Sequence, residues 1–190
     1  MRTLFLAIIL IPFALQGFSQ YKYEKETRIK EADVPKNALS FVESLNFNTK
    51  IKWYEETGYD RISFEAKTKY NGKLYSIEFS EEGTFEDVEI VIEPDEIPPS
   101  VFTLINNYLH SKYNKLSIQK IQIQYKGDRD EMIHFLNTEE SNEHIETNYE
   151  LVISAKIEGS FVLFEYLFSG NGEFINRQQI ILKRFENIQY

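Results

Sequence analysis

Three histidines and a run of carboxylates are the residues of this chain most able to do chemistry. His110, His134 and His144 are scattered along the second half. His110 falls near the end of a predicted helix, where a positive imidazole suits the helix dipole. We therefore predict structural or surface roles for all three histidines.

Carboxylate side chains are dense between Asp128 and Glu146, close to Gly127 and His144. Oxygen ligands of this kind bind hard cations, so a cation site is one interpretation of the segment. The ordered spacing of a calcium loop is missing, however, and we favour a solvated acidic loop. The sequence predicts no metal site and no cofactor.

Motifs of known catalytic sites are missing from the sequence. It holds no Gly-x-Ser-x-Gly elbow, no His-Glu-x-x-His pair, no phosphate loop and no dinucleotide fingerprint. It also has no cysteine, which excludes disulfides, thiolate metal sites and a cysteine nucleophile. We therefore expect a protein that is not an enzyme.

One predicted strand, over residues 161–168, is apolar on both faces. Phe164, Tyr166 and Phe168 mark one face by their period of two. The other face also carries apolar side chains, and an uncovered apolar patch on a sheet marks an interaction site. The candidate binding residues are Phe161, Leu163 and Leu167.

The same strand has a second interpretation, in which both faces are covered within the chain. The cover would be the first half of the protein or a short amphipathic helix. The apolar residues of that helix are Met132, Ile133, Phe135 and Leu136. In this case the candidate residues are ordinary core.

An internal repeat predicts the elements that position these residues. The segment Phe79–Phe85 returns as Phe168–Phe174, with Phe-Ser, Gly and Phe at one fixed displacement. Upstream, an acidic residue and a proline open an apolar helical pattern twice, which predicts helices at about 35–46 and 98–112. After each helix the apolar period changes to two, which is typical of strands.

The sequence thus predicts an α+β fold that is a tandem repeat of two units. Each unit is a helix packed on an antiparallel β-sheet of about four strands. The first unit spans residues 33–92, and the second spans 96–183 with an insertion at about 127–147. A stiff acidic linker, Glu93–Glu96, joins them.

Two segments carry a family resemblance. Glu96–Val101, which reads EIPPSV, and Tyr75–Phe85, which reads YSIEFSEEGTF, resemble the PepSY-like domains of exported bacterial proteins. These domains are also grouped as β-lactamase-inhibitor-protein-like (BLIP-like) for their tandem helix-plus-sheet units. The resemblance covers about residues 33–183, and it implies a binding or inhibitory module with no catalytic residues to carry over. The insertion departs from the compact repeat of the family.

The start of the chain has the pattern of a secretory signal. Arg2 precedes the apolar run Leu4–Leu15, and Gly17 and Ser19 suit a cut before Gln20. We predict a signal peptide over residues 1–19 and an exported protein, periplasmic or extracellular. An uncleaved anchor and a buried element of the fold are the alternatives. No later segment reaches the roughly 18 apolar residues of a membrane span, so we expect no membrane insertion after cleavage.

The charge balance bears on the partner. Lys and Arg total 21 against 30 Asp and Glu, a formal net charge of −9. Nucleic acid and anionic membranes need clustered cations on the protein, so neither is expected as a partner. A basic protein or a cation is a better candidate. We predict an exported non-catalytic binding module, an inhibitor or protein-interaction protein of the cell envelope, with a protein partner. A structural envelope-associated protein without a discrete ligand is the main alternative, and an enzyme is a third.

Overall fold

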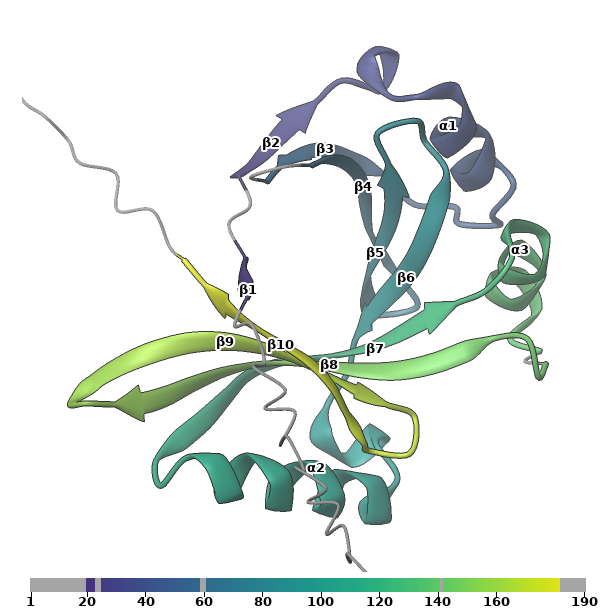
Figure 1. Cartoon of the computed structure of the whole chain (residues 1–190). Helices are drawn as coiled ribbons and strands as arrows, with labels where there is room; N and C mark the ends of the chain where they lie inside the picture. The colour runs from purple at the N-terminus through teal and green to yellow at the C-terminus, as the bar shows by residue number, and fades with distance from the viewer. Residues whose placement is uncertain (1–19, 23–24, 59–60, 141, 182–190) are drawn as a thin grey trace, which may run out of the picture.

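The computed structural model describes residues 20–22, 25–58, 61–140 and 142–181. Ten strands of these residues form one sheet, in the order β1-β10-β9-β8-β7-β6-β5-β4-β3-β2 (Figure 1). Neighbouring strands are antiparallel except β1 and β10, which are parallel. The strands are β1 (Gln20–Lys22), β2 (Lys25–Ile29), β3 (Lys52–Thr57), β4 (Ile62–Tyr70), β5 (Lys73–Ser80), β6 (Phe85–Val91), β7 (Leu116–Lys126), β8 (Glu146–Ile157), β9 (Ser160–Ser169) and β10 (Phe174–Ile180).

The prediction of two repeated helix-on-sheet units is wrong. Strand β6 pairs with β7 from Val88 opposite Tyr125 to Val91 opposite Gln122, and this pairing joins both halves into one sheet. The physical reason is that β6 would otherwise end its half with a row of unpaired backbone groups, which β7 satisfies. The domain boundaries at 33–92 and 96–183 stay a prediction, and the signal peptide at 1–19 lies outside the described residues.

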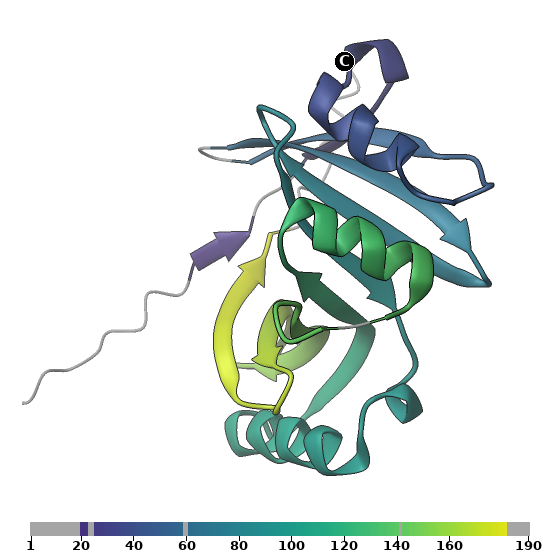
Figure 2. The same cartoon turned by 90° about the vertical axis from the view of Figure 1, so that its right-hand side faces the viewer.

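Three helices lie on one face of the sheet, which we call the outer face: α1 (Lys36–Glu43), α2 (Pro99–Lys112) and α3 (Arg129–Thr138). Figure 2 shows α1 and α3 over one half of the sheet and α2 at the other end. Both proline-led helices were predicted, although α1 ends earlier than expected. Two short 3-10 turns, Glu31–Asp33 and Pro94–Glu96, precede α1 and α2. Among the described residues, no helix has the length and apolar character needed to cross a membrane.

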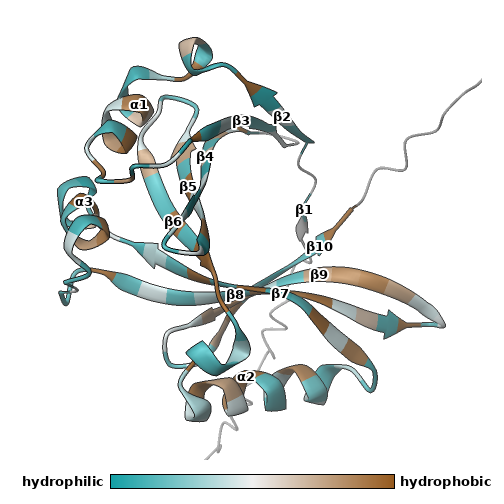
Figure 3. Ribbon diagram, turned by 180° about the vertical axis from the view of Figure 1, so that it is seen from behind, coloured by the Kyte–Doolittle hydropathy of each residue, from teal (hydrophilic) through white to brown (hydrophobic). Residues whose placement is uncertain are grey.

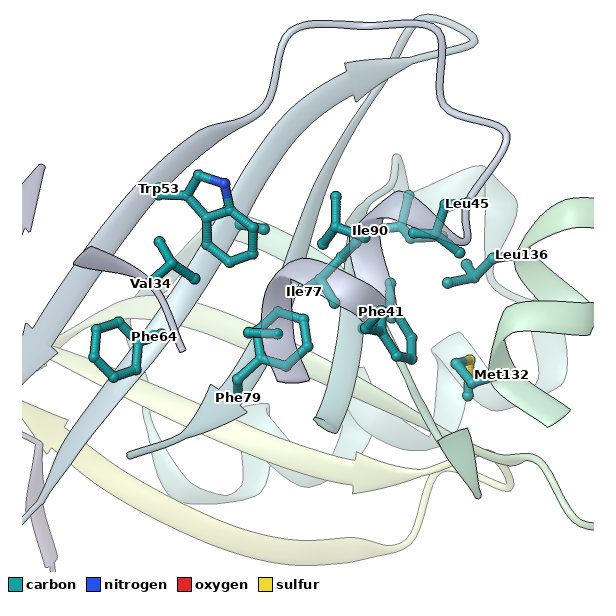
Figure 4. Packing of buried hydrophobic residues seen from close by; sticks show 14 of the residues in the cluster. Val34, Phe41, Leu45, Trp53, Phe64, Ile77, Phe79, Ile90, Met132 and Leu136 are labelled. Carbon is teal, nitrogen blue, oxygen red and sulfur yellow. The ribbon is translucent and has the colours of Figure 1, made fainter. Parts of the chain in front are cut away.

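The helices cover two hydrophobic clusters on the outer face. The first packs α1 and α3 on β3 to β6, with Phe41, Met132 and Phe79 buried in it (Figure 4). The second packs Ile105 and Leu109 of α2 on β7, β8 and β9. Fully burying a large aliphatic or aromatic side chain contributes about 1.5–3 kcal/mol. The clusters therefore hold the helices on the sheet.

The insertion predicted at about 127–147 contains α3, and its helical pattern is confirmed. Met132 and Leu136 point into the first cluster, beside Phe41 and Leu45 (Figure 4). The insertion helix therefore covers the first half of the sheet, on the outer face. It does not cover the other face of β9, because the side chains of that face point away from the helices.

Glycines at two turns allow close packing on the helix starts. Gly83 has φ +78°, and a Cβ added there would lie 2.6 Å from the Cβ of Pro35. Gly172 has φ +82°, and an added Cβ would lie 3.2 Å from the carbonyl oxygen of Val101. Both turns follow the repeated Phe-Ser motif, which therefore marks a tight turn against a helix.

The sheet curls so that its two edges come close together. Edge strands β1 and β2 are consecutive in the chain, yet β1 pairs with β10 and β2 with β3. Lys22 and Lys25 are three residues apart, so at most about 10 Å separates their Cα atoms. The helices lie outside this curl (Figure 1). The opposite face, which we call the inner face, lines a hollow.

Candidate functional site

The inner face is polar because the strands alternate. On β5, Ile77 and Phe79 are buried in the first cluster on the outer face, so Glu78 between them points inward. On β9, Phe164 and Tyr166 lie under α2, which sends Glu165 inward. Figure 3 shows apolar and polar residues alternating along the strands.

A hollow of about 450 Å³ on the inner face collects side chains from all ten strands. We call it the acidic hollow, because seven glutamates and three lysines line it. The glutamates are Glu26, Glu56, Glu65, Glu78, Glu89, Glu150 and Glu165. The lysines are Lys22, Lys67 and Lys120. The sequence analysis missed these residues as a group, although it predicted the polar alternation of several of the strands that carry them.

Two of the lysines pair with glutamates. Lys22 Nζ lies 2.9 Å from Glu165 Oε2. Lys67 Nζ lies 2.8 Å from Glu65 Oε2 and 3.0 Å from Glu26 Oε1. These pairs neutralise part of the charge, and acidic groups remain in excess over basic ones.

The middle of the inner face holds carboxyl groups that are shielded from water. Asp87 on β6 is 6% exposed, and Glu89 and Glu150 are each 7% exposed. Carboxylates are almost never this buried unless they are paired. Gln122 Nε2 donates to Glu89 Oε2 at 2.7 Å, and Gln124 Nε2 donates to Asp87 Oδ2 at 3.3 Å. Neutral amides therefore hold these two carboxyl groups in place.

Burial and mutual repulsion raise the pKa values of these carboxyl groups. The pKa of Asp87 rises to about 7, first through burial and then through the charge of Glu89. Burial also raises the pKa of Glu78 and of Glu150, and neighbouring carboxylates add to both shifts. A carboxyl group of this kind holds a proton near neutral pH, binds a cation, or accepts hydrogen bonds from a basic ligand.

Two groups of three carboxylates have ligand oxygens within 4.8 Å of one another, among the residues that the structure describes. One is Glu26, Glu56 and Glu65, and the other is Glu78, Asp87 and Glu89. The acidic segment between Asp128 and Glu146, which the sequence offered as a cation site, contributes to neither group.

The three candidate binding residues from sequence lie on β9. Leu163 and Leu167 are half-buried on the inner face, on either side of Glu165. Leu167 stands opposite Glu150 in the register, and Leu163 stands opposite Ser154. Leu167 is therefore next to Glu150, and both leucines are two residues from Glu165; Glu150 and Glu165 line the acidic hollow.

Phe161 lies farther along β9, on the same face, and is 58% exposed. The ammonium group of Lys115 lies 5.7 Å from the centre of its ring. At about 3.3 Å per residue, the six steps from Phe161 to Leu167 span about 20 Å. The three residues thus form a stripe along one strand, which we call the apolar stripe.

Comparison with known proteins identifies a fold. No protein-family model matches the chain, and no curated protein matches its sequence. Its fold is similar to the crystal structure of a DUF2874 family protein from Bacteroides ovatus, with TM-score 0.51, 11% identity and coverage of 83% of this chain and 95% of that one. A DUF2874 family protein from Bacteroides uniformis matches with TM-score 0.50 and 13% identity over 77% of this chain and 89% of that one.

A BLIP-like protein from Bacteroides fragilis matches with TM-score 0.46 and 17% identity, over 83% of this chain and 93% of that one. The three structures thus include one BLIP-like protein and no PepSY-like protein.

Proposed function

We propose that this protein is an exported, non-catalytic binding module that receives a basic segment of a partner protein on the inner face of its sheet. The observation that carries the proposal is the acidic hollow, to which every strand contributes a side chain. The sheet brings together carboxylates that lie far apart in the sequence, from Glu26 to Glu165.

Electrostatics favours a basic partner. Seven glutamates and three lysines line the hollow. Burial raises the pKa values of Glu78, Glu89 and Glu150, and the other four glutamates still outnumber the lysines. The whole chain has a formal net charge of −9. A concave surface with one dominant sign of charge concentrates ligands of the opposite sign and speeds their association. The effect weakens as salt is added.

The size of the hollow limits what enters it. A volume of about 450 Å³ falls in the range of pockets that hold small ligands, about 300–1,000 Å³. It therefore admits a loop or a few side chains of a partner rather than a whole domain. Lysine and arginine side chains match the carboxyl groups that line it.

The apolar stripe supplies the other element of a protein interface. Interfaces combine apolar anchors with polar surroundings, and aromatic residues are common among the anchors. Phe161 is the exposed aromatic residue of the stripe, and Leu163 and Leu167 flank the charged pair of Glu165 and Lys22. A partner that enters the hollow along β9 would contact both kinds of surface.

Site-specific photo-crosslinking in the producing cells tests this proposal. A photoreactive amino acid is placed at Leu163 or Leu167 on the inner face, and at Leu104 on α2 as a control. Leu104 is 54% exposed on the outer side of the molecule. We expect one partner adduct from both inner positions, weakened by added salt, and none from Leu104. Adducts from Leu104 alone, or no adduct from the inner positions, would contradict the proposal.

A further inference from the structure

Three carboxylates on neighbouring strands form a compact group at the middle of the inner face. Glu78 on β5 stands directly opposite Asp87 on β6, and Glu89 follows two residues later on the same face of β6. One oxygen of each lies within 4.8 Å of the others. We call these three residues the carboxylate triad.

Buried oxygens at the carboxylate triad have no hydrogen-bond partner. Asp87 is 6% exposed, its Oδ2 accepts from Gln124, and its Oδ1 is buried without a partner. Gln122 is 4% exposed, and its Nε2 donates to Glu89, while its Oε1 is buried without a partner. A buried oxygen left unpaired is destabilising, and a bound cation would satisfy it.

Several lysines lie around this group. Lys126 Nζ lies 3.8 Å from Asp87 Oδ2, at the edge of the triad. Lys22 pairs with Glu165, and its charge also acts on all three carboxylates of the triad. Lys67 pairs with Glu65, and Glu56 and Glu165 add negative charge nearby. Lys120 also faces the hollow and acts on Glu89 through its charge.

The second carboxylate group of the inner face provides a contrast. In the group of Glu26, Glu56 and Glu65, the ammonium of Lys67 lies 3.0 Å from Glu26 and 2.8 Å from Glu65. Lys67 therefore contacts two members of that group at close range, whereas Lys126 reaches Asp87 of the carboxylate triad at the longer distance of 3.8 Å.

The ligand chemistry indicates a hard divalent cation. All the donors are oxygens, from three carboxylates and the free amide oxygen of Gln122. Hard cations prefer such donors, while zinc and copper sites favour nitrogen or sulfur. Calcium binds oxygens at about 2.3–2.6 Å with flexible geometry, so it can bridge donors up to 4.8 Å apart.

We propose that Glu78, Asp87 and Glu89 bind one Ca²⁺ ion on the inner face, with Gln122 Oε1 as a neutral ligand. The ion links β5 to β6 and, through Gln122, to β7. It stabilises the sheet where the two halves of the chain meet. Glu78, Glu89 and Gln122 also line the acidic hollow, but binding of the ion does not require the proposed protein partner.

Calcium titration of the purified, EDTA-treated protein tests this proposal without any partner. We expect isothermal titration calorimetry to show one Ca²⁺ per chain with Kd of about 0.1–1 mM, as in extracellular calcium modules. At 10 mM Ca²⁺ the midpoint of thermal unfolding should rise by about 3–11 °C over NaCl of equal ionic strength. No binding heat and no shift beyond that of NaCl would overturn the proposal.

Variants locate the ion. Asp87→Asn and Glu78→Gln should each weaken Ca²⁺ binding at least about tenfold, whereas Glu26→Gln in the other group should change it less than about twofold. Circular dichroism checks that each variant folds, and Glu89→Gln replaces one that does not. Equal affinity in the triad variants and the wild type would place the ion elsewhere and refute the site. Calcium binding and photo-crosslinking are separate measurements, so either proposal can fail alone.

Discussion

The packing of α3 leads to a prediction about how the protein unfolds. Met132 is fully buried in the first cluster, and replacement by alanine removes its side chain from contact with that cluster (Figure 4). Buried Met→Ala substitutions cost about 2–5 kcal/mol. We expect Met132→Ala to lower the free energy of unfolding by about 3 kcal/mol. For a chain of this length the melting temperature should fall by about 6–12 °C.

A second part of this prediction concerns the cooperativity of the sheet. Because β6 and β7 are paired, the loss at α3 should be felt by both halves in one transition. Urea unfolding should be followed by the fluorescence of Trp53, the single tryptophan, and by far-ultraviolet circular dichroism. His134→Ala, an exposed change on the same helix, is the control and should stay within about 0.5 kcal/mol.

The outcome that refutes this reasoning is specific. If the free energy of unfolding of Met132→Ala is within about 0.5 kcal/mol of that of the wild type, α3 does not pack on the first cluster. If the two signals give separate transitions, the halves unfold independently, and the pairing of β6 with β7 does not make the sheet cooperative.

Three further predictions concern the N-terminus, the apolar stripe and the buried acids. Mass spectrometry of the exported protein should find Gln20 as the first residue, and retention of Met1 in a membrane fraction would refute the signal peptide. Leu163→Ala should weaken the affinity for the cross-linked partner about thirtyfold in a titration, which equals about 2 kcal/mol of binding free energy, with little change in melting temperature. A large fall in melting temperature would instead show that Leu163 is an ordinary core residue. In EDTA, Asp87→Asn should gain stability relative to the wild type from about pH 5 to about pH 8. A carboxyl whose pKa rises from 3.8 to about 7 on folding takes up a proton, so its contribution is lost as pH rises. Urea unfolding at both pH values checks this, and a difference that does not vary with pH would contradict it.

Alternation in the sequence predicted the two faces of several strands. Ile77 and Phe79 were assigned to the buried face of β5, and both are fully buried. The apolar pattern that includes Met132 and Leu136 predicted α3. These features are local, because a period of two or of 3.6 depends only on residues within one element.

The single sheet could not be predicted in the same way. Alternation shows which face of a strand is apolar, but not which strand lies beside it. The linker Glu93–Glu96 suggested a boundary between two units, yet β7 returns to pair with β6. The two-unit prediction failed at that pairing.

The acidic hollow depends on the same long-range pairing. The local sequence around each of its glutamates predicts a solvent-facing residue of a half-buried strand, as for Glu78 in β5. Pairing of β5 with β6 brings Glu78 close to Glu89, and the assembly of all the strands brings Glu150 close to Glu89 and shields these groups from water. Without neighbours across the sheet, nothing in the sequence distinguishes them from ordinary surface acids.

The central claim is that the inner face binds the partner, and lysine labelling tests it most directly. The free protein and its complex with the partner identified by cross-linking are each treated with an acetylating reagent. Mass spectrometry then measures the labelling of each lysine. Lys120 lies exposed on the inner face, and Lys112 lies exposed on α2. The account predicts that the complex protects Lys120 and leaves Lys112 labelled as in the free protein. Protection of Lys112 with Lys120 unchanged would contradict it.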